Sequence, residues 1–86
     1  MLSEVEVKDK IKQTIIKTAE LKIFPEEIKD NTKLLDEFGL DSIMILEILL
    51  NLEKNFNIQF GEDEIGIDIF DDFACLSRFV IKTLNK

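Results

Sequence analysis

The sequence FGLDSIMILEILLNLEKNF, residues 38–56, joins a turn, a polar pair and a long apolar run. Gly39 supplies a sharp turn, because glycine adopts backbone conformations that other residues avoid. Asp41 is a typical N-cap, so a helix is predicted to start there, with Ser42 in its first turn, and to run to about Phe56. No histidine exists anywhere in the chain to activate Ser42 as a nucleophile. The hydroxyl at the head of this apolar segment therefore needs another explanation.

Apolar residues occupy more of this helix than one packing face requires. The spacing i, i+3, i+4, i+7 defines a face suited to the core, and its members are Ile45, Ile48, Leu49, Leu52 and Phe56. Ser42, Leu46 and Leu50 follow at intervals of four and share another side. Ile43 and Met44 also lie partly off the core face. A small bundle cannot cover every face, so some of these apolar residues are expected to form an exposed interaction strip. The alternative is a central helix that is mostly buried.

The remaining segments are also predicted to be mainly helical. Ser3 and Glu6 fit a capping box, and the apolar spacing that follows predicts a first helix from about Ser3 to Leu21. Residues 24–40 form a long connection with a short helical turn near Pro25–Ile28. Its later apolar residues are expected to pin it to the core; these are Leu34, Leu35, Phe38 and Leu40.

Two further helices are expected after residue 56. A short one is predicted over Glu62–Ile65, ended by Gly66, and a last one begins after the cap residue Asp72. Two short alternating stretches have no hairpin turn signal, so no strand is predicted. The prediction is an all-α fold in one domain, residues 1–86, with three main helices and one short helix. Phe70 and Phe73 are expected in the core.

Composition limits the function. With 86 residues and 45% hydrophobic side chains, the chain can build one modest core but no deep catalytic cavity. The formal net charge of −7 argues against nucleic-acid binding. It favours a partner with a basic patch, although acidity that only keeps the protein soluble explains the charge equally well.

Cysteine and histidine usage exclude several other classes. One cysteine, Cys75, forms no intrachain disulfide, and without histidine it builds no zinc site. Cys75 is expected to be half-buried and unreactive, with nothing basic beside it. The first ten residues lack the features of a secretory signal, and no apolar run is long enough to span a bilayer. A cytoplasmic protein without membrane contact or a bound metal is the expectation.

Helix electrostatics offer a role for Ser42. The N-terminus of a helix presents free N–H groups and about half a positive charge, so it suits a phosphate. A phosphoester on Ser42 would be stabilised there, and Asp41 could hold a metal ion brought by a partner enzyme. Plain N-capping explains an Asp-Ser pair before an apolar helix as well, and spacing alone favours that reading.

The segment FGLDSIMILEILLNLEKNF resembles the signature of acyl and peptidyl carrier proteins, in which Asp-Ser-Leu or Asp-Ser-Ile opens a long apolar helix. The first helix, the pinned loop, the acidic short helix and the closing DFACLSRFVIKTL have counterparts in that family. The resemblance spans nearly the whole chain. It implies an acyl-carrier-like four-helix bundle that is not itself an enzyme.

The resemblance also implies a cofactor and partners. Ser42 would carry covalent 4′-phosphopantetheine, added from coenzyme A by a phosphopantetheinyl transferase, and Asp41 would help that enzyme to place its metal. The cofactor thiol would hold acyl, polyketide or aminoacyl groups as thioesters. Ile43, Leu46 and Leu50 match positions that partner enzymes touch. Acids that meet basic patches on acyl-, aminoacyl- or ketosynthase-type enzymes would be Glu47 and Glu53.

This chain departs from fatty-acid carriers at three positions. Met44 and Ile45 stand where such carriers more often have an acid and a small polar residue, and Lys54 stands where another acid is common. These departures favour a freestanding carrier of a specialised pathway, and an aminoacyl or D-alanyl carrier stays open. The carrier is expected to be a monomer. The alternative function is a small helical interaction module in which Ser42 is only a cap and no cofactor is bound.

Overall fold

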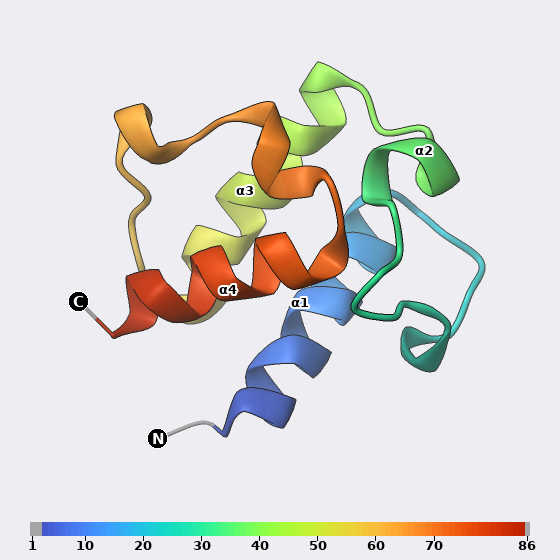
Figure 1. Cartoon of the computed structure of the whole chain (residues 1–86), viewed down its shortest axis with the longest axis horizontal. Helices are drawn as coiled ribbons and strands as arrows, with labels where there is room; N and C mark the ends of the chain where they lie inside the picture. Colours follow the sequence, from blue (N-terminus) through green and yellow to red (C-terminus); the bar gives the residue numbers. More distant parts are fainter. Residues whose placement is uncertain (1–2, 86) are drawn as a thin grey trace.

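The computed structural model describes residues 3–85, which form four α-helices and three 3₁₀ turns (Figure 1). The helices are α1 (Glu4–Thr18), α2 (Leu34–Phe38), α3 (Ser42–Phe56) and α4 (Phe73–Leu84), and the turns are η1 (Pro25–Glu27), η2 (Glu62–Glu64) and η3 (Ile67–Phe70). No strand occurs within residues 3–85. The predicted all-α fold is therefore confirmed.

α1 begins as predicted and ends earlier than predicted. The Ser3 hydroxyl accepts from the Glu6 N–H, and the Glu6 carboxylate accepts from the Ser3 N–H, each at 3.2 Å, which completes the capping box. The helix stops at Thr18 rather than Leu21, because Glu20 has a left-handed backbone with φ 54°. The Leu21 N–H then donates to the Ile16 carbonyl at 2.9 Å, which closes the helix end.

The long connection before α3 contains a helix that the sequence pattern did not predict. α2 is only five residues long and has no side-chain cap at Lys33, so neither periodicity nor capping signals it. Leu34 is fully buried, which confirms that this segment is pinned to the core. Gly39 ends α2 with φ 58°, as its predicted role in a sharp turn requires.

The segment after α3 also differs from the prediction. The expected short helix at Glu62–Ile65 is the single 3₁₀ turn η2, and Gly66 does not end a helix but precedes a second turn, η3. Neither turn has a side-chain cap, and both are too short for a stable α-helix. Phe70 at the end of η3 is fully buried, so the segment is anchored to the core at that point.

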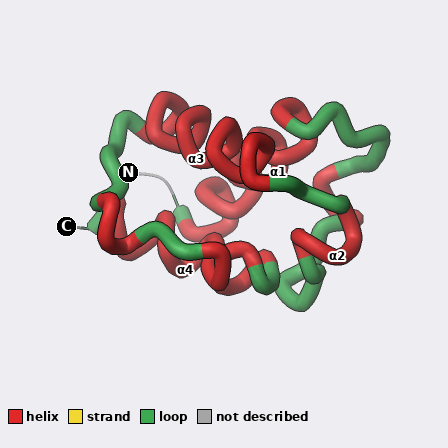
Figure 2. Tube along the Cα trace, turned by 90° about the horizontal axis from the view of Figure 1, so that it is seen from above, coloured by secondary structure: helices red, strands yellow, loops and turns green. Residues whose placement is uncertain are grey.

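The core lies where α1, α3 and α4 meet (Figure 2). Two hydrogen bonds show that α1 and α3 run antiparallel. The side-chain amide of Asn55 donates to the Thr14 hydroxyl and that of Asn51 donates to the Thr18 hydroxyl, each at 2.8 Å. Buried side chains from all three helices fill the interior; they include Ile11, Ile15, Ile48, Leu52, Phe73, Leu76 and Val80. The antiparallel arrangement brings the C-terminal end of α1, at Thr18, beside the middle of α3, at Asn51.

The start of α4 is tied to the connection before α2. The N–H of Phe73 donates to the Thr32 carbonyl at 3.0 Å, and that of Ala74 donates to the Asp30 carbonyl at 2.9 Å. Lys12 of α1 places its ammonium group 5.3 Å from the centroid of the buried Phe73 ring. These contacts hold the long connection against α1 and α4, so that α2 and Gly39 can deliver the chain to the start of α3.

Candidate functional site

Ser42 is the first residue of α3, and its side chain is exposed. Asp41 precedes it in an extended conformation, and its Oδ1 accepts from the Met44 N–H at 2.8 Å. The Asp41 carbonyl accepts from the Ile45 N–H at 2.9 Å. Asp41 is therefore the N-cap that the sequence predicted. Because it satisfies the cap, the hydroxyl of Ser42 is left to face solvent.

The backbone around Ser42 fits a phosphate ester. Two of the four N–H groups at the start of α3 are bonded to Asp41, which leaves those of Ser42 and Ile43 without an intrahelical partner. These donors and the positive end of the helix dipole favour an anion bound at the Ser42 oxygen. The exposed hydroxyl also leaves room for a large substituent. The residues at the start of α3 therefore fit a phosphopantetheine group attached at Ser42.

Three of the predicted docking side chains form an exposed apolar row beside Ser42. Ile43 is 70% exposed, Leu46 is 56% exposed and Leu50 is 50% exposed. Met44 is instead half-buried and packs against the core, as does Ile45. The helix thus has both a buried face and an exposed strip, and the alternative of a mostly buried helix is wrong.

The two predicted acidic contacts have different environments. The Glu47 side chain is exposed on α3. Glu53 is half-buried, and its Oε2 accepts from the N–H of Phe60 at 2.8 Å. The Glu53 carboxylate therefore anchors the loop that follows α3. This backbone contact spans seven residues and no local sequence pattern signals it.

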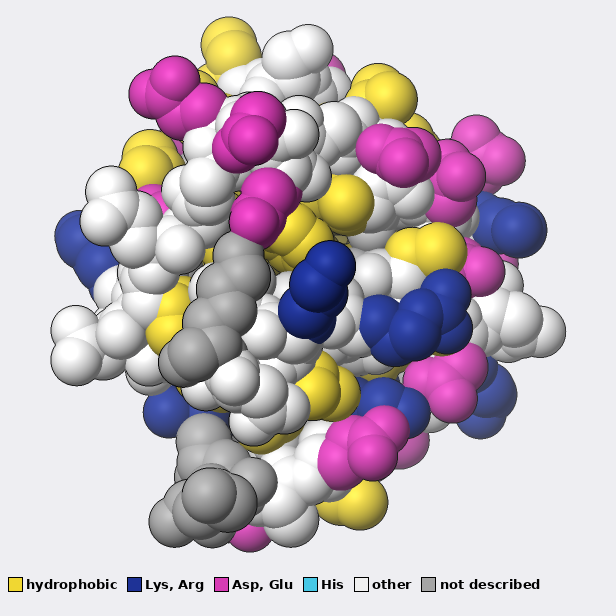
Figure 3. Space-filling view, turned by 60° about the vertical axis from the view of Figure 1, so that its left-hand side comes forward, with side chains coloured by type: hydrophobic (Ala, Val, Ile, Leu, Met, Phe, Trp, Pro, Cys, Tyr) yellow, Lys and Arg dark blue, Asp and Glu magenta, His cyan; other side chains and the backbone are white. Residues whose placement is uncertain are grey.

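The segment from η2 to η3 adds exposed apolar side chains that the sequence analysis did not assign to a surface. Ile65 is 40% exposed and Ile67 is 67% exposed. The alternation of isoleucine at 65, 67 and 69 was the available signal, and Ile69 alone of the three packs against the core. On the face drawn in Figure 3, hydrophobic side chains show as separate patches between acidic and basic ones.

Cys75 lies outside this site. The Cys75 N–H donates to Asp72 Oδ1 at 2.8 Å, and that backbone hydrogen bond is the main cause that lowers the pKa of Asp72. Its half-buried thiol lies 3.5 Å from an Arg78 guanidinium nitrogen, so the expectation that nothing basic adjoins it is wrong. The pKa of the thiol is nevertheless raised, chiefly by its hydrogen bond with Asp72. A raised pKa disfavours the reactive thiolate.

Within residues 3–85 no group of three or more Cys, Asp or Glu side chains is arranged to hold a metal ion. No helix in that range combines the length and the apolar character needed to cross a membrane.

The chain matches known families over most of its length. The family model described as "phosphopantetheine attachment site" matches residues 9–80. An acyl carrier protein of Wolinella succinogenes is 34% identical over 56 residues, which cover 65% of this chain and 71% of that protein. An acyl carrier protein of Buchnera aphidicola is 33% identical over 58 residues, which cover 67% and 71%.

A solved structure shares the fold. The solution NMR structure of a holo acyl carrier protein from Nitrosomonas europaea aligns with this chain at a TM-score of 0.84 and 21% sequence identity. The alignment covers 92% of this chain and 96% of that protein. At this identity the likeness shows the fold alone. It confirms the acyl-carrier-like helical bundle that the sequence resemblance implied.

The fold and the site are those of a small helical carrier protein that presents an exposed serine at a helix N-terminus. The chain belongs to the phosphopantetheine attachment-site family, whose curated members similar to it are acyl carrier proteins. It is accordingly a phosphopantetheine-dependent carrier protein and not an enzyme.

Proposed function

We propose that this chain is a freestanding carrier, a single domain in which Ser42 holds covalent 4′-phosphopantetheine. The observation that carries the proposal is the exposed hydroxyl on the first residue of α3, at the head of an exposed apolar row and inside the matched residues 9–80. When bound, the group supplies a thiol on a flexible arm, which holds cargo as a thioester.

The residues around Ser42 have separate roles in its loading. The Ser42 Oγ forms a bond to phosphorus, the pyrophosphate bond of coenzyme A breaks, and adenosine bisphosphate leaves; a base of the transferase takes the hydroxyl proton. Asp41 keeps Oδ1 on the Met44 N–H, and its other carboxylate oxygen can face the metal ion of the transferase. The N–H groups of Ser42 and Ile43 would be available as donors to the phosphate.

Partner enzymes are expected to dock on the outer side of α3. Ile43, Leu46 and Leu50 supply apolar contact, and they are exposed in the free protein. Glu47 supplies a charge for a basic patch on the phosphopantetheinyl transferase or on an acyl-, aminoacyl- or ketosynthase-type enzyme. We propose Glu53 as a contact at the margin of this surface, because its Oε2 already accepts from the Phe60 N–H.

The cargo we favour is an acyl group. The curated relatives are named acyl carrier proteins, and this supports an acyl cargo over a polyketide or aminoacyl one. Met44 and Ile45 were the main reasons to expect a specialised pathway, and both pack against the core rather than extending the exposed row. A monomeric state, a cytoplasmic location, and the absence of nucleic-acid and membrane partners stay predictions from composition.

Intact-mass measurement tests the proposal. The native chain, incubated with coenzyme A and a broad phosphopantetheinyl transferase, is expected to gain the mass of one phosphopantetheinyl group. Ser42→Ala is expected to gain none. Ser3→Ala is the matched control, because Ser3 is also an exposed serine at a helix N-terminus, and it should be loaded like the native chain. No gain in the native chain, or a gain that persists in Ser42→Ala, would contradict the proposal.

A further inference from the structure

Lys54 ends the row of side chains that Ser42 begins. Ser42, Leu46, Leu50 and Lys54 follow one another at intervals of four along α3, so they share one side of the helix. The first and last of them are separated by about 18 Å along the helix axis. A surface that covers Leu46 and Leu50 therefore lies within reach of both the attachment serine and this lysine.

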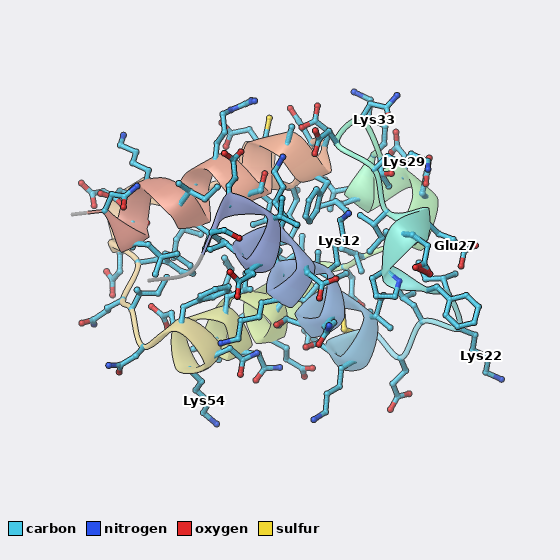
Figure 4. All side chains as sticks on the ribbon, turned by 90° about the horizontal axis from the view of Figure 1, so that it is seen from below. Lys12, Lys22, Glu27, Lys29, Lys33 and Lys54 are labelled. Carbon is cyan, nitrogen blue, oxygen red and sulfur yellow. The ribbon has the colours of Figure 1, made fainter. Side chains whose placement is uncertain are left out.

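The ammonium group of Lys54 has no partner within residues 3–85. Both ion pairs in that part of the chain belong to Lys8, and Lys54 makes no hydrogen bond through its side chain there. The neighbouring acid, Glu53, is held by the Phe60 N–H. Figure 4 shows Lys54 extending from α3 away from the rest of the molecule. Its positive charge is therefore available to whatever covers this face.

The exposed side of α3 carries charged side chains of both signs. A shallow groove along the helix is lined by Glu47, Leu50, Asn51, Glu53, Lys54 and Asn57. Glu53 is a second acid there, but its Oε2 accepts from the Phe60 N–H, whereas the Lys54 ammonium group is free of partners within residues 3–85. Glu47 lies toward Ser42, and Lys54 lies in the last turn of the helix. A complementary surface would place a base opposite Glu47, apolar side chains opposite the row, and a carboxylate opposite Lys54.

We infer that Lys54 is a specificity-determining residue, which selects partner enzymes that present a carboxylate at this position and disfavours enzymes whose docking patch is basic throughout. This deepens the proposed function and rests on it, because the enzymes concerned are those that dock beside Ser42. Juxtaposed like charges at an interface suppress the wrong partner and slow its association, while opposite charges favour the right one.

A second copy of this chain fits the same face poorly. An antiparallel pair of α3 helices would match Glu47 with Lys54 only if the pair were centred between Leu50 and Asn51. Leu50 would then meet Leu50 of the other copy, but Leu46 would face Asn55, and Ile43 would lie beyond the end of the other α3. Charge matching would therefore leave Ile43 and Leu46 without apolar partners, so the occupant we assign is a different protein.

The test uses a broad phosphopantetheinyl transferase with a basic docking patch as the probe, with kcat/KM for loading of Ser42 as the readout. Lys54→Glu is expected to raise kcat/KM by about three- to tenfold, and Lys54→Gln by less, because each relieves repulsion from the basic patch. The effect should shrink in 0.5 M NaCl, since salt of about this concentration screens exposed charges beyond a few ångströms.

Lys82→Glu is the matched control. Lys82 is also an exposed lysine in the last turn of a helix, so Lys82→Glu changes the net charge and the interaction with the helix dipole in the same way as Lys54→Glu. Lys82 lies on α4, however, and not on the proposed docking side of α3. It should change kcat/KM by less than about twofold. A reciprocal arm replaces single bases of the transferase patch by glutamate. At least one such variant should load the native chain faster than the unaltered transferase does, and load Lys54→Glu more slowly.

The outcomes separate the inference from the function on which it rests. If Lys54→Glu and Lys82→Glu change the rate equally, or if no reciprocal variant favours the native chain, the inference fails while the carrier function stands. If no variant is loaded, the carrier function fails and the inference with it. Dimers in sedimentation that Lys54→Glu dissociates would assign the face to a second copy and would also overturn the inference. Thermal unfolding monitored by circular dichroism confirms that each variant is folded.

Discussion

Asp41 is assigned two different roles at this site. Its carboxylate caps α3 through the Met44 N–H at 2.8 Å, and it stands directly before the serine that we expect to be loaded. A cap needs only an oxygen acceptor, whereas help with a metal ion needs the negative charge. Asparagine keeps the first property and removes the second, so substitutions at this position can separate the two roles.

We predict that Asp41→Asn keeps the stability of the native chain within about 0.5 kcal/mol, while Asp41→Ala lowers the free energy of unfolding by about 1 kcal/mol, because alanine leaves the Met44 N–H without its acceptor. Both variants should be loaded at least about tenfold more slowly by the transferase, a loss typical of a missing charged contact. Urea denaturation and loading kinetics measure the two effects. Normal loading of Asp41→Asn would restrict Asp41 to capping.

Glu53 shows the limit of residue-level inference. The family resemblance implied a partner contact, which stays a prediction, whereas the chain folds back after α3 and places the Phe60 N–H on one oxygen of the Glu53 carboxylate. Sequence spacing describes which side of a helix a residue occupies. It does not show which later segment returns to cover that side.

At the scale of the helices, capping residues were the most reliable signals. Ser3, Asp41 and Asp72 each cap the helix they were predicted to cap. The cap on α4 has a consequence for acid stability, because the Cys75 N–H bonded to Asp72 lowers the pKa of that carboxyl. A group with a lowered pKa in the folded protein contributes stability above its unfolded pKa, and that contribution is lost as the pH falls through the folded value.

Asp72→Asn is therefore expected to flatten the loss of stability below about pH 4, where an ordinary aspartate becomes protonated. Asparagine caps helices well, so the variant should differ little from the native chain at pH 7. Urea denaturation across pH 3–7 checks this. Asp63→Asn, which alters an exposed acid in η2 instead, should leave the acid limb of the native curve unchanged. Parallel curves for all three proteins would show that the Asp72 cap does not contribute.

At the scale of the whole molecule, the excess of negative charge lies in one part of the sequence. Residues 1–33 hold seven acids and seven bases, whereas residues 34–86 hold eleven acids and four bases, which accounts for the net charge of −7. The second part includes α3 and the proposed attachment site. Self-repulsion among these acids opposes folding, while the same charges attract a basic partner.

Salt should therefore act on stability and loading in opposite directions. Raising NaCl from about 0.05 to 0.5 M is expected to raise the midpoint of thermal unfolding, because it screens repulsion between the acids. Over the same range kcat/KM for loading should fall by about tenfold, because steering toward the basic transferase weakens. Potassium chloride serves as a control for a specific sodium effect. Changes in the same direction would contradict this account of the charge distribution.

The sequence by itself determined the features that depend on neighbours along the chain. Helix caps and the left-handed Gly39 follow from interactions within a few residues. The periodicity of α3 indicated its core face but left open whether the rest of the helix is buried. Other features depend on tertiary structure. α2 forms where packing of Leu34 stabilises a helix that is too short to be predicted from its sequence pattern. Glu20 ends α1 in a left-handed conformation although it is not a glycine, and the Glu53 carboxylate accepts a hydrogen bond from the loop that returns after α3. Such contacts depend on which distant segments pack together, and the free energy of that packing outweighs weak local preferences.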